Sequence, residues 1–399
     1  MWGFSVPSWC RKNRYCVVKS LFDIVLKSID TINHSIDKLL NAIDKIHHAI
    51  DTALIFFKKK EPNQPRSNTT CYERSNSMII KPLSYPLALK QLEAIQKRLP
   101  PEHPKAEKVN QQLMMKSAGY KGEKNLEYPL SFLDSDTYSI FFDLRLFDGK
   151  HHFQMDALIL SSSFIVILEV KNIAGTLYFD TGFNQLIRTY NNTQESFPDP
   201  LIQIKRQEAQ FTIWCKQQSI PEIPIHSFVV ISSPKTILTA SPDQPPPHHS
   251  VIPNLMVHKK ILELTNKFSD NLILAHELHQ VGLKLLANHS SAKVNMLQTM
   301  QIEKYEIQPG VICDHCRFLP LEYVRRQGWK CSRCSKYTID GAQKALRDYG
   351  LIINRRISTK DAKLFLKTNS GPLVRSLFKS MDLYPVGRSR SYQYVIPHA

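Results

Sequence analysis

The sequence predicts an α/β protein. Short apolar runs rich in branched residues alternate with segments of helical periodicity, which is the pattern of strands flanked by helices. Two further patterns frame this core: a heptad repeat near the N-terminus and two Cys-x-x-Cys motifs near the C-terminus. A chain of 399 residues has room for two or three domains. We therefore expect a long helix, an α/β core and a metal-binding ribbon, in that order.

The composition indicates a polyanionic partner. The chain carries 52 Lys and Arg residues against 35 Asp and Glu residues, a formal net charge of +17. This excess favours nucleic acid first and an anionic membrane surface second. No apolar run is long enough to span a bilayer, and the N-terminus lacks the cleavage site of a signal peptide. Four of the eight cysteines form one cluster and the others are scattered, which fits a reducing, cytoplasmic compartment.

Residues 1–60 are predicted to contain a long association helix. Between Phe22 and Phe57, apolar residues, mostly isoleucine, recur at alternating spacings of three and four. This heptad pattern indicates a coiled coil, and isoleucine at both core positions favours three or more strands. The alternative is an amphipathic helix that lies on its own protein or on a membrane. We expect homo-oligomerisation through residues 20–57, followed by a polar, proline-containing linker over 61–77.

A helical lead-in over residues 78–118 and an α/β domain over 119–288 should follow. The lead-in has helical patterns at 87–99 and 106–118, on either side of the Pro100-Pro101 break. A Pro-rich stretch predicts a loop at 241–253. Within the α/β domain we expect strands at 141–147, 156–160, 164–170, 176–179, 186–190 and 227–232, and helices at 201–216 and 271–288.

One hairpin of this domain carries charged residues at one end of otherwise apolar strands. Asp156 begins it, and Glu169 and Lys171 end it on one face of a strand, because side chains alternate. Burying such charges unpaired costs roughly several kcal/mol, so they should pair or hold a metal ion. Two carboxylates suit Mg²⁺, which activates a bound water and offsets charge on a phosphate. An ordinary ion pair at the end of a strand is the alternative.

The hairpin resembles that of the PD-(D/E)XK nuclease superfamily, in which an Asp precedes strands that end in Glu-x-Lys. More narrowly, it resembles the nuclease-related domain (NERD) family. Upstream, Gly119-Tyr-Lys-Gly-Glu123 is similar to the Gly-x-x-Gly-Glu start of the family's first helix. Downstream, Asp199-Pro-Leu-Ile-Gln203 is similar to its Asn-Pro-Leu-x-Gln segment, with Asp199 in place of Asn. The resemblance covers residues 115 to 285 and implies a restriction-endonuclease-like core.

The resemblance also implies a metal-dependent phosphodiesterase that acts on DNA. Asp156 and Glu169 would hold Mg²⁺, and Lys171 would position the attacking water. Glu123 would hold a second metal or orient a ligand, and Gln203 would fix the water or a phosphate. Cleavage would leave a 5′-phosphate and a 3′-hydroxyl. Without the family match, Gln203 is equally well explained as a solvent-facing helix residue.

Residues 309–338 are predicted to form a zinc ribbon. Cys313-Asp-His-Cys316 and Cys331-Ser-Arg-Cys334 are two knuckles separated by fourteen residues, and four thiolates so spaced bind Zn²⁺ tetrahedrally. A redox pair would need only one knuckle. Cations beside the aromatic residues Tyr323 and Trp329 suit contact with phosphates and stacking on bases, although a solvated ribbon that only braces the fold is the alternative. The cations that we expect to bind nucleic acid here are Arg325, Arg326, Lys330 and Arg333.

Residues 339–399 are predicted to form a helical, winged-helix-like module. Three short helical patterns cover 340–349, 359–366 and 372–381, and a basic turn and strand follow at 387–394. Arg388 and Arg390 would lie in the wing, and such modules bind nucleic acid at least as often as they mediate protein contacts.

The sequence as a whole predicts a Mg²⁺-dependent DNA nuclease with a structural zinc site. The main alternative is a catalytically silent nucleic-acid-binding protein of the same fold, in which Glu169 and Lys171 form a structural pair. A third is an oligomeric or membrane-surface scaffold built on the first sixty residues. The arrangement of Asp156 and Glu169 bears on the first two, because one ion can be shared only between neighbouring carboxylates.

Overall fold

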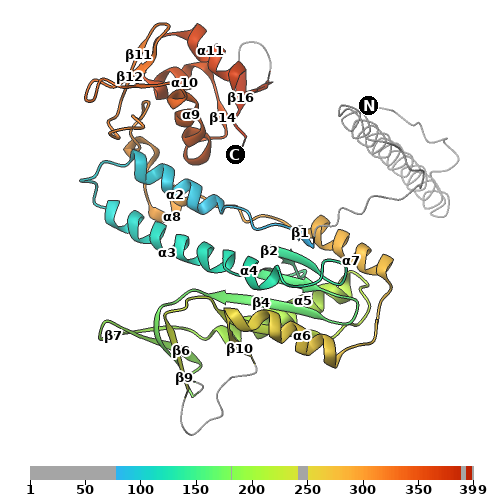
Figure 1. The fold of residues 1–399 in the computed structure, drawn as a ribbon. Coiled ribbons are helices and arrows are strands. Elements are labelled where there is room, and N and C mark those ends of the chain that lie inside the picture. The colour runs from blue at the N-terminus through green and yellow to red at the C-terminus, as the bar shows by residue number, and fades with distance from the viewer. Residues whose placement is uncertain (1–77, 181, 241–249, 388–391, 398–399) are drawn as a thin grey trace, which may run out of the picture. The chain divides into compact units, whose positions relative to one another are not determined.

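The computed structural model describes residues 78–180, 182–240, 250–387 and 392–397 (Figure 1). All of them belong to one of the two units into which the chain divides, Ser75–Ala399. The predicted association helix within residues 1–60, the linker and the two arginines of the wing, Arg388 and Arg390, lie outside the described residues.

A mixed six-stranded sheet forms the centre of the α/β domain (Figure 1). Its strands, in spatial order, are β1 (Ile79–Lys81), β2 (Ser139–Phe147), β3 (His152–Leu160), β4 (Ile165–Lys171), β8 (Ile225–Ile231) and β10 (Val251–Pro253). Neighbours among β2, β3 and β4 pair antiparallel, whereas β4, β8 and β10 run parallel. The parallel strands end at one edge of the sheet, and β4 ends there with the predicted charged residues.

Helices cover both faces of this sheet. On one face, Ile165 and Ile167 of β4 pack with Phe211 and Trp214 of the helix that precedes β8 in the chain. On the other face, the alternate residues of β4 pack with two other helices. Because β4 is buried on both faces, its sequence is a nearly continuous apolar run. The covering helices are α5 (Pro200–Gln217) and α7 (Ala275–Asn288) on the first face, and α4 (Glu127–Leu130) and α6 (Val257–Lys267) on the second.

A second, four-stranded sheet is built from three strands that lie between β4 and β8 in the chain and one strand, β9, that follows β8. Its strands, in spatial order, are β7 (Thr193–Pro198), β6 (Gln185–Tyr190), β5 (Gly175–Asp180) and β9 (Thr236–Ala240). The sequence predicted β5 and β6, which carry the buried apolar residues of this sheet, but it did not predict β9. It missed β7, whose residues are mostly exposed and polar and so lack an alternating pattern.

The remaining elements confirm or correct the sequence expectations. The mixed α/β class is confirmed, and no described helix is both long and apolar enough to cross a membrane. The expected loop at 241–253 is wrong at its end, because Val251–Pro253 is the edge strand β10. Helix α6 was missed although Val257, Ile261 and Leu264 have helical spacing.

The helical lead-in is an antiparallel pair whose second member is longer than expected. Helix α2 (Leu87–Arg98) packs on α3 (Ala106–Lys124), which runs without a break through Gly119 to the charged end of the α/β domain. Gly122 allows α3 to approach the end of β4 closely, because a Cβ there would lie 2.6 Å from the Cβ of Asn172 and 2.8 Å from Ser232 Oγ. A short helix that the sequence analysis missed, α8 (Met296–Met300), completes the hydrophobic cluster of α2 and α3.

The C-terminal region has one hydrophobic core, which holds both the cysteine motifs and the last helices. It begins with the ribbon strands β11 (Glu322–Val324), β12 (Gly328–Lys330) and β13 (Tyr337–Thr338). The elements that follow are α9 (Gly341–Ile352), β14 (Arg356–Ile357), α10 (Thr359–Leu366), α11 (Gly371–Ser380), β15 (Pro385–Val386) and β16 (Gln393–Val395). From α9 onward they have the order expected of a winged-helix-like module, and β14, β16 and β15 form a three-stranded antiparallel sheet.

Arg98 ties the lead-in to the C-terminal region. Its side chain is 1% exposed, and its Nε donates a hydrogen bond to Asp348 Oδ2 of α9 at 2.8 Å. Its Nη1 donates to the carbonyl oxygens of Gln308 and Gly310 at 3.2 and 3.0 Å, and its guanidinium lies 4.8 Å from the ring centre of Phe365. A buried arginine whose donors are used in this way holds α2 and α9 at a defined separation.

Replacing Arg98 should therefore loosen the C-terminal region. We expect Arg98→Ala to cost about 3–5 kcal/mol, because it leaves the Asp348 carboxylate half-buried without its cation. Hydrogen exchange of the α9 amides, followed by mass spectrometry, measures the loss. Lys116→Ala, at an exposed position of α3, is the control, and equal protection of α9 in both variants would contradict the role of Arg98.

Candidate functional site

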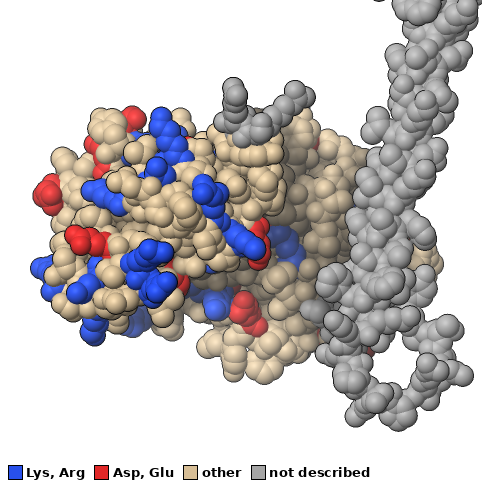
Figure 2. All heavy atoms as spheres, turned by 90° about the horizontal axis from the view of Figure 1, so that it is seen from above, with Lys and Arg blue, Asp and Glu red and all other residues tan. Residues whose placement is uncertain are grey.

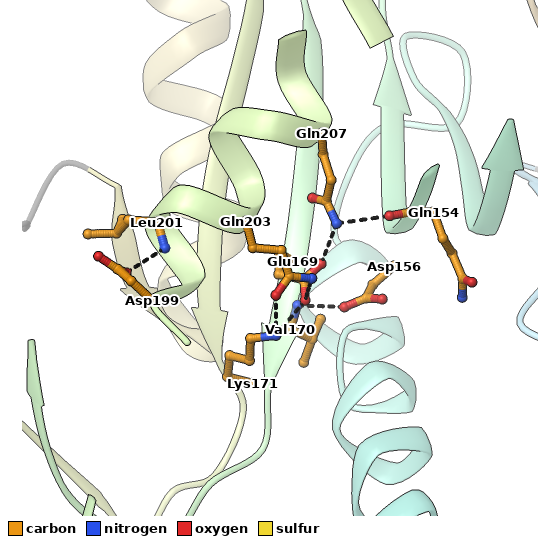
Figure 3. A network of polar contacts seen from close by, with 9 residues as sticks. All are labelled: Gln154, Asp156, Glu169, Val170, Lys171, Asp199, Leu201, Gln203 and Gln207. Carbon is orange, nitrogen blue, oxygen red and sulfur yellow. Dashed lines mark hydrogen bonds and ion pairs between the residues drawn. The ribbon is translucent and has the colours of Figure 1, made fainter. Parts of the chain in front are cut away.

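The candidate site lies where β3 separates from β4. The two strands pair only up to Ala157 and Leu168, whereas β4 runs on to Lys171 beside β8. The main-chain N–H of Val170 therefore has no main-chain partner in β3, and the side chain of Asp156 accepts its hydrogen bond through Oδ2 at 2.7 Å (Figure 3). The separation of the strands opens a gap in the sheet beside the end of β4.

Asp143 kinks the neighbouring strand β2 at the same level. Its φ of +49° is one that residues other than glycine rarely adopt. Phe142 and Leu144 pack on opposite faces of the sheet, although residues two apart in a regular strand share a face. Lys81 Nζ donates to the carbonyl oxygens of Phe142 and Asp143 at 2.7 and 2.8 Å. The register of β2 and β3 puts this kink opposite Asp156.

Glu169 is the centre of a polar network in this gap (Figure 3). Only 4% of the residue is exposed, and its Oε1 accepts hydrogen bonds from Lys171 Nζ and Gln203 Nε2, each at 2.6 Å. Lys171 Nζ also donates to Gln203 Oε1 at 2.9 Å. The three side chains thus form a closed ring of contacts between β4 and the first turn of α5.

Helix α5 supplies a second glutamine, Gln207, which the sequence analysis did not place in the site. Its Nε2 donates to Glu169 Oε2 and to the carbonyl oxygen of Gln154, each at 2.8 Å. Its Oε1 is buried and has no hydrogen-bond partner among the described residues. The signal in the sequence was the spacing of four from Gln203, which puts both amides on one face of a helix.

The α5 helix starts where its sequence predicts. Asp199 Oδ1 accepts a hydrogen bond from the N–H of Leu201 at 2.8 Å, and Pro200 occupies the first helical position. Asp and Asn are equally good caps, which explains why Asp199 can stand in place of the family's Asn.

Glu123 reaches the site from the end of α3. The close approach at Gly122 brings α3 against the end of β4, where Asn172 Nδ2 donates to the carbonyl oxygen of Ala118 at 2.7 Å. Burial, the charge of Asp143 and the charge of Glu169 together raise the pKa of Glu123 to about 7. Five predicted site residues are therefore brought together by four separate elements: Glu123, Asp156, Glu169, Lys171 and Gln203.

The carboxylates of the site repel one another. Burial, followed by the charges of Glu169 and Glu123, holds the pKa of Asp156 well above its usual value, although the Val170 N–H and Lys171 act in the opposite direction. Clustered acids with raised pKa values are a common feature of functional sites. A bound cation would remove this repulsion, because it favours the ionised form of each carboxylate.

The donors present suit a hard cation such as Mg²⁺. Carboxylate oxygens and the unpartnered amide oxygen of Gln207 are the kind of ligand that this ion prefers. Across the described ranges, the cysteines alone bring three or more potential ligand atoms within 4.8 Å of one another. The carboxylates of the site are more widely spread, so a Mg²⁺ ion would bind one or two of them and keep several waters, as it usually does.

The four cysteines, by contrast, form a compact group that can hold a metal ion such as zinc. The Sγ atoms of Cys313 and Cys334 lie 3.6 Å apart, as do those of Cys316 and Cys331, and all four lie within 4.8 Å of one another. A tetrahedral site with Zn–S bonds of about 2.3 Å has edges of about 3.8 Å. The thiols are therefore already arranged as a tetrahedral metal requires.

The predicted nucleic-acid contacts of the ribbon are only partly accessible. Exposed side chains belong to Arg325, Arg326, Lys330 and Arg333. Trp329, which we expected to stack on bases, is 2% exposed and packs in the C-terminal core, so it cannot do so. Its ring centre lies 5.5 Å from that of Tyr323, which remains partly exposed.

Comparison with known families agrees with this geometry. Residues 118–232 match the model of the nuclease-related domain family, a segment that runs from the end of α3 to the end of β8. It includes every residue of the network around Glu169 and excludes the cysteine motifs. The chain therefore contains a nuclease-related domain. No curated protein and no solved structure matches the chain at a significant level.

The raised pKa of Glu123 makes stability depend on pH. Its pKa rises from 4.5 in the unfolded chain to about 7 in the fold, so its contribution to stability is full below pH 4.5 and is lost as the pH rises to about 7. Without added Mg²⁺, Glu123→Gln should match the wild type in melting temperature near pH 5 and exceed it near pH 7.5. Thermal melts measure the difference. They contain no chelator, because a chelator would also compete for any metal ion held by the four cysteines. A difference independent of pH would contradict the shift.

Proposed function

We propose that this chain, which carries a nuclease-related domain, is a Mg²⁺-dependent nuclease that hydrolyses phosphodiester bonds in DNA. The observation that carries the proposal is the set of mutually repelling carboxylates beside a lysine that is already in hydrogen-bond contact with Glu169. Acids that only stabilised the fold would each have a cation or a set of N–H donors. Here Glu123 and Asp156 have raised pKa values instead, which a divalent cation would reverse.

The residues have distinct roles in this reaction. When bound, Mg²⁺ would lower the pKa of a coordinated water and offset charge on the scissile phosphate. Asp156 and Glu169 would hold the ion through carboxylate oxygens, and Glu123 would hold a second ion or orient a ligand. Lys171 positions the attacking water and stabilises the negative charge that develops on the phosphate. The expected products carry a 5′-phosphate and a 3′-hydroxyl.

Helix α5 assists through its N-terminus and its amides. Gln203 in its first turn holds Lys171 through Oε1 and Glu169 through Nε2, so it orients both groups at once. The N-terminal end of a helix carries partial positive charge, which favours a phosphate near Gln203. Gln207 is a positioning residue, since it acts on Glu169 through its hydrogen bond to Oε2.

The alternative is a catalytically silent nucleic-acid-binding protein. One observation favours it: Glu169 already accepts three hydrogen bonds, so its pairing with Lys171 can be purely structural. The two functions differ in a single measurable property, which is metal-dependent cleavage.

Glu169→Gln should remove cleavage but retain binding. The substitution keeps the shape of the side chain and removes the charge that holds the metal. We expect Mg²⁺-dependent cleavage of linear, circular and single-stranded DNA to fall at least about 100-fold, which corresponds to the several kcal/mol that a metal supplies. Glu263→Gln, on the exposed face of α6, is the control. A wild-type protein that cleaves no nucleic acid with any divalent metal would establish the silent alternative.

We further propose that the four cysteines bind one zinc ion and form a zinc ribbon. Metal analysis should find about one zinc per chain, the number for four thiolates in one tetrahedral site. Cys331→Ser should lower this content and increase hydrogen exchange in β11, β12 and β13, because metal binding and folding are linked. Ser332→Ala, an exposed neighbour, should change neither. Full zinc occupancy in Cys331→Ser would show that the ion lies elsewhere.

Association through residues 20–57 and a cytoplasmic location also belong to this proposal. Both come from the sequence, through the isoleucine heptads and the scattered cysteines. Light scattering by the full chain measures the first.

A further inference from the structure

Positive charge is distributed very unevenly along this chain. Residues 309–399 contain 17 Lys and Arg residues against six Asp and Glu residues, whereas residues 119–288 contain 14 against 17. Most of the net charge of +17 therefore lies in the C-terminal region, and residues 119–288, which include the nuclease-related domain, are slightly acidic. Lysine and arginine side chains are numerous on the face of the C-terminal region seen in Figure 2. A polyanion should accordingly be attracted to this region first.

A cleft with a volume of about 450 Å³ lies between the lead-in and this region. Helix α2 forms one wall and α9 the other, and residues of the first cysteine motif close one end. The buried ion pair of Arg98 and Asp348 lies between the walls. We call it the α2–α9 cleft, and none of the ribbon cations singled out from the sequence lines it.

The acidic residues of the cleft are already neutralised or engaged. Asp348 pairs with Arg98 at 2.8 Å, Asp314 pairs with Lys344 at 3.0 Å, and Glu93 accepts a hydrogen bond from the Tyr85 hydroxyl. Four other cations that line the cleft form no ion pair with any described residue: Lys90, Lys97, Arg317 and Arg347. Their charges come from three different elements and remain available to a ligand.

The spacing of these charges suits a row of phosphates. Lys90 and Lys97 are seven residues apart on one face of α2, which separates them by about 10 Å along the helix. One nucleic-acid strand rises about 3.4 Å per phosphate, so about three phosphates span this distance. On the opposite wall, α9 begins at Gly341, and its N-terminal N–H groups add partial positive charge. A single small anion would leave most of these cations without a partner.

We propose that the α2–α9 cleft binds the phosphodiester backbone of one nucleic-acid strand and holds it for the nuclease-related domain. This inference takes its class of ligand from the proposed function, but it concerns binding and not cleavage. From the junction with α2, helix α3 runs about 26 Å to Glu123. A strand held in the cleft would therefore be attached to the same pair of helices that positions one carboxylate of the site.

The test reverses two charges on opposite walls of the cleft. We would introduce Lys97→Glu and Arg347→Glu into the full chain with Glu169→Gln, and measure fluorescence anisotropy with single-stranded DNA of about 30 nucleotides, long enough to span both regions. The experiment contains no divalent metal, so catalysis plays no part. We expect binding to weaken at least about 10-fold, and the slope of log K against log salt to fall by about two.

Two matched pairs separate the cleft from other basic surfaces. Lys150→Glu with Lys216→Glu makes the same charge change at exposed positions near the far end of α5, about 20 Å along that helix from Gln203. This pair should leave binding and its salt dependence unchanged. Arg326→Glu with Arg333→Glu tests the ribbon. Zinc content and circular dichroism must match the parent protein in each variant.

Several outcomes would overturn the inference. They are unchanged binding in the cleft variant, an equal loss in the far pair, or a loss in the ribbon pair alone. Inorganic phosphate that displaces DNA more strongly than chloride at equal ionic strength would indicate a site for a small anion. A cleft variant that loses binding to anionic phospholipid vesicles but not to DNA would indicate a membrane surface. If the cleft variant fails to bind DNA while the wild type cleaves nothing, the cleft is supported and the nuclease is not.

Discussion

The separation of β3 from β4 is the constraint on which the candidate site depends. A continuous ladder would use the Val170 N–H for strand pairing and would leave no space beside Glu169. Because the strands part beyond the Ala157–Leu168 pair, the Asp156 carboxylate replaces the missing ladder partner at 2.7 Å, and α3 and α5 contact the end of β4. The kink at Asp143, held by Lys81, lies opposite Asp156 in the neighbouring strand.

Acidic and basic residues are concentrated in different regions of this protein. The nuclease-related domain places acids together, which a metal requires and which repels nucleic acid. The C-terminal region carries the compensating positive charge on a frame held by the cysteine cluster and by the buried pair of Arg98 and Asp348. Such a frame keeps the basic surface and the lead-in helices at a defined separation, so in the proposed nuclease the attraction of DNA and its cleavage need not use the same residues.

Local patterns in the sequence predicted much of the fold and of the site. The apolar runs that became β2, β4, β5, β6 and β8, and the long helices α2, α5 and α9, all have a strong periodicity or a clear cap, and they appear within a few residues of their predicted limits. What was missed has weak local signals. Strand β10 has three residues, and β7 is polar and exposed. Helix α3 continues through two glycines, which a local pattern takes for a helix end, and one of them, Gly122, allows the close approach to Asn172.

The sequence by itself determined the chemistry at the end of β4. Glu169 and Lys171 are two residues apart and must share a face of any strand, and four cysteines in two knuckles must be able to meet. Only the tertiary structure decided which other groups join them. Asp143, Gln207 and the cations of the α2–α9 cleft come from elements far apart in the chain. Their meeting depends on how helices and strands pack, and packing is set by the shapes of side chains across the whole core, which no local pattern contains.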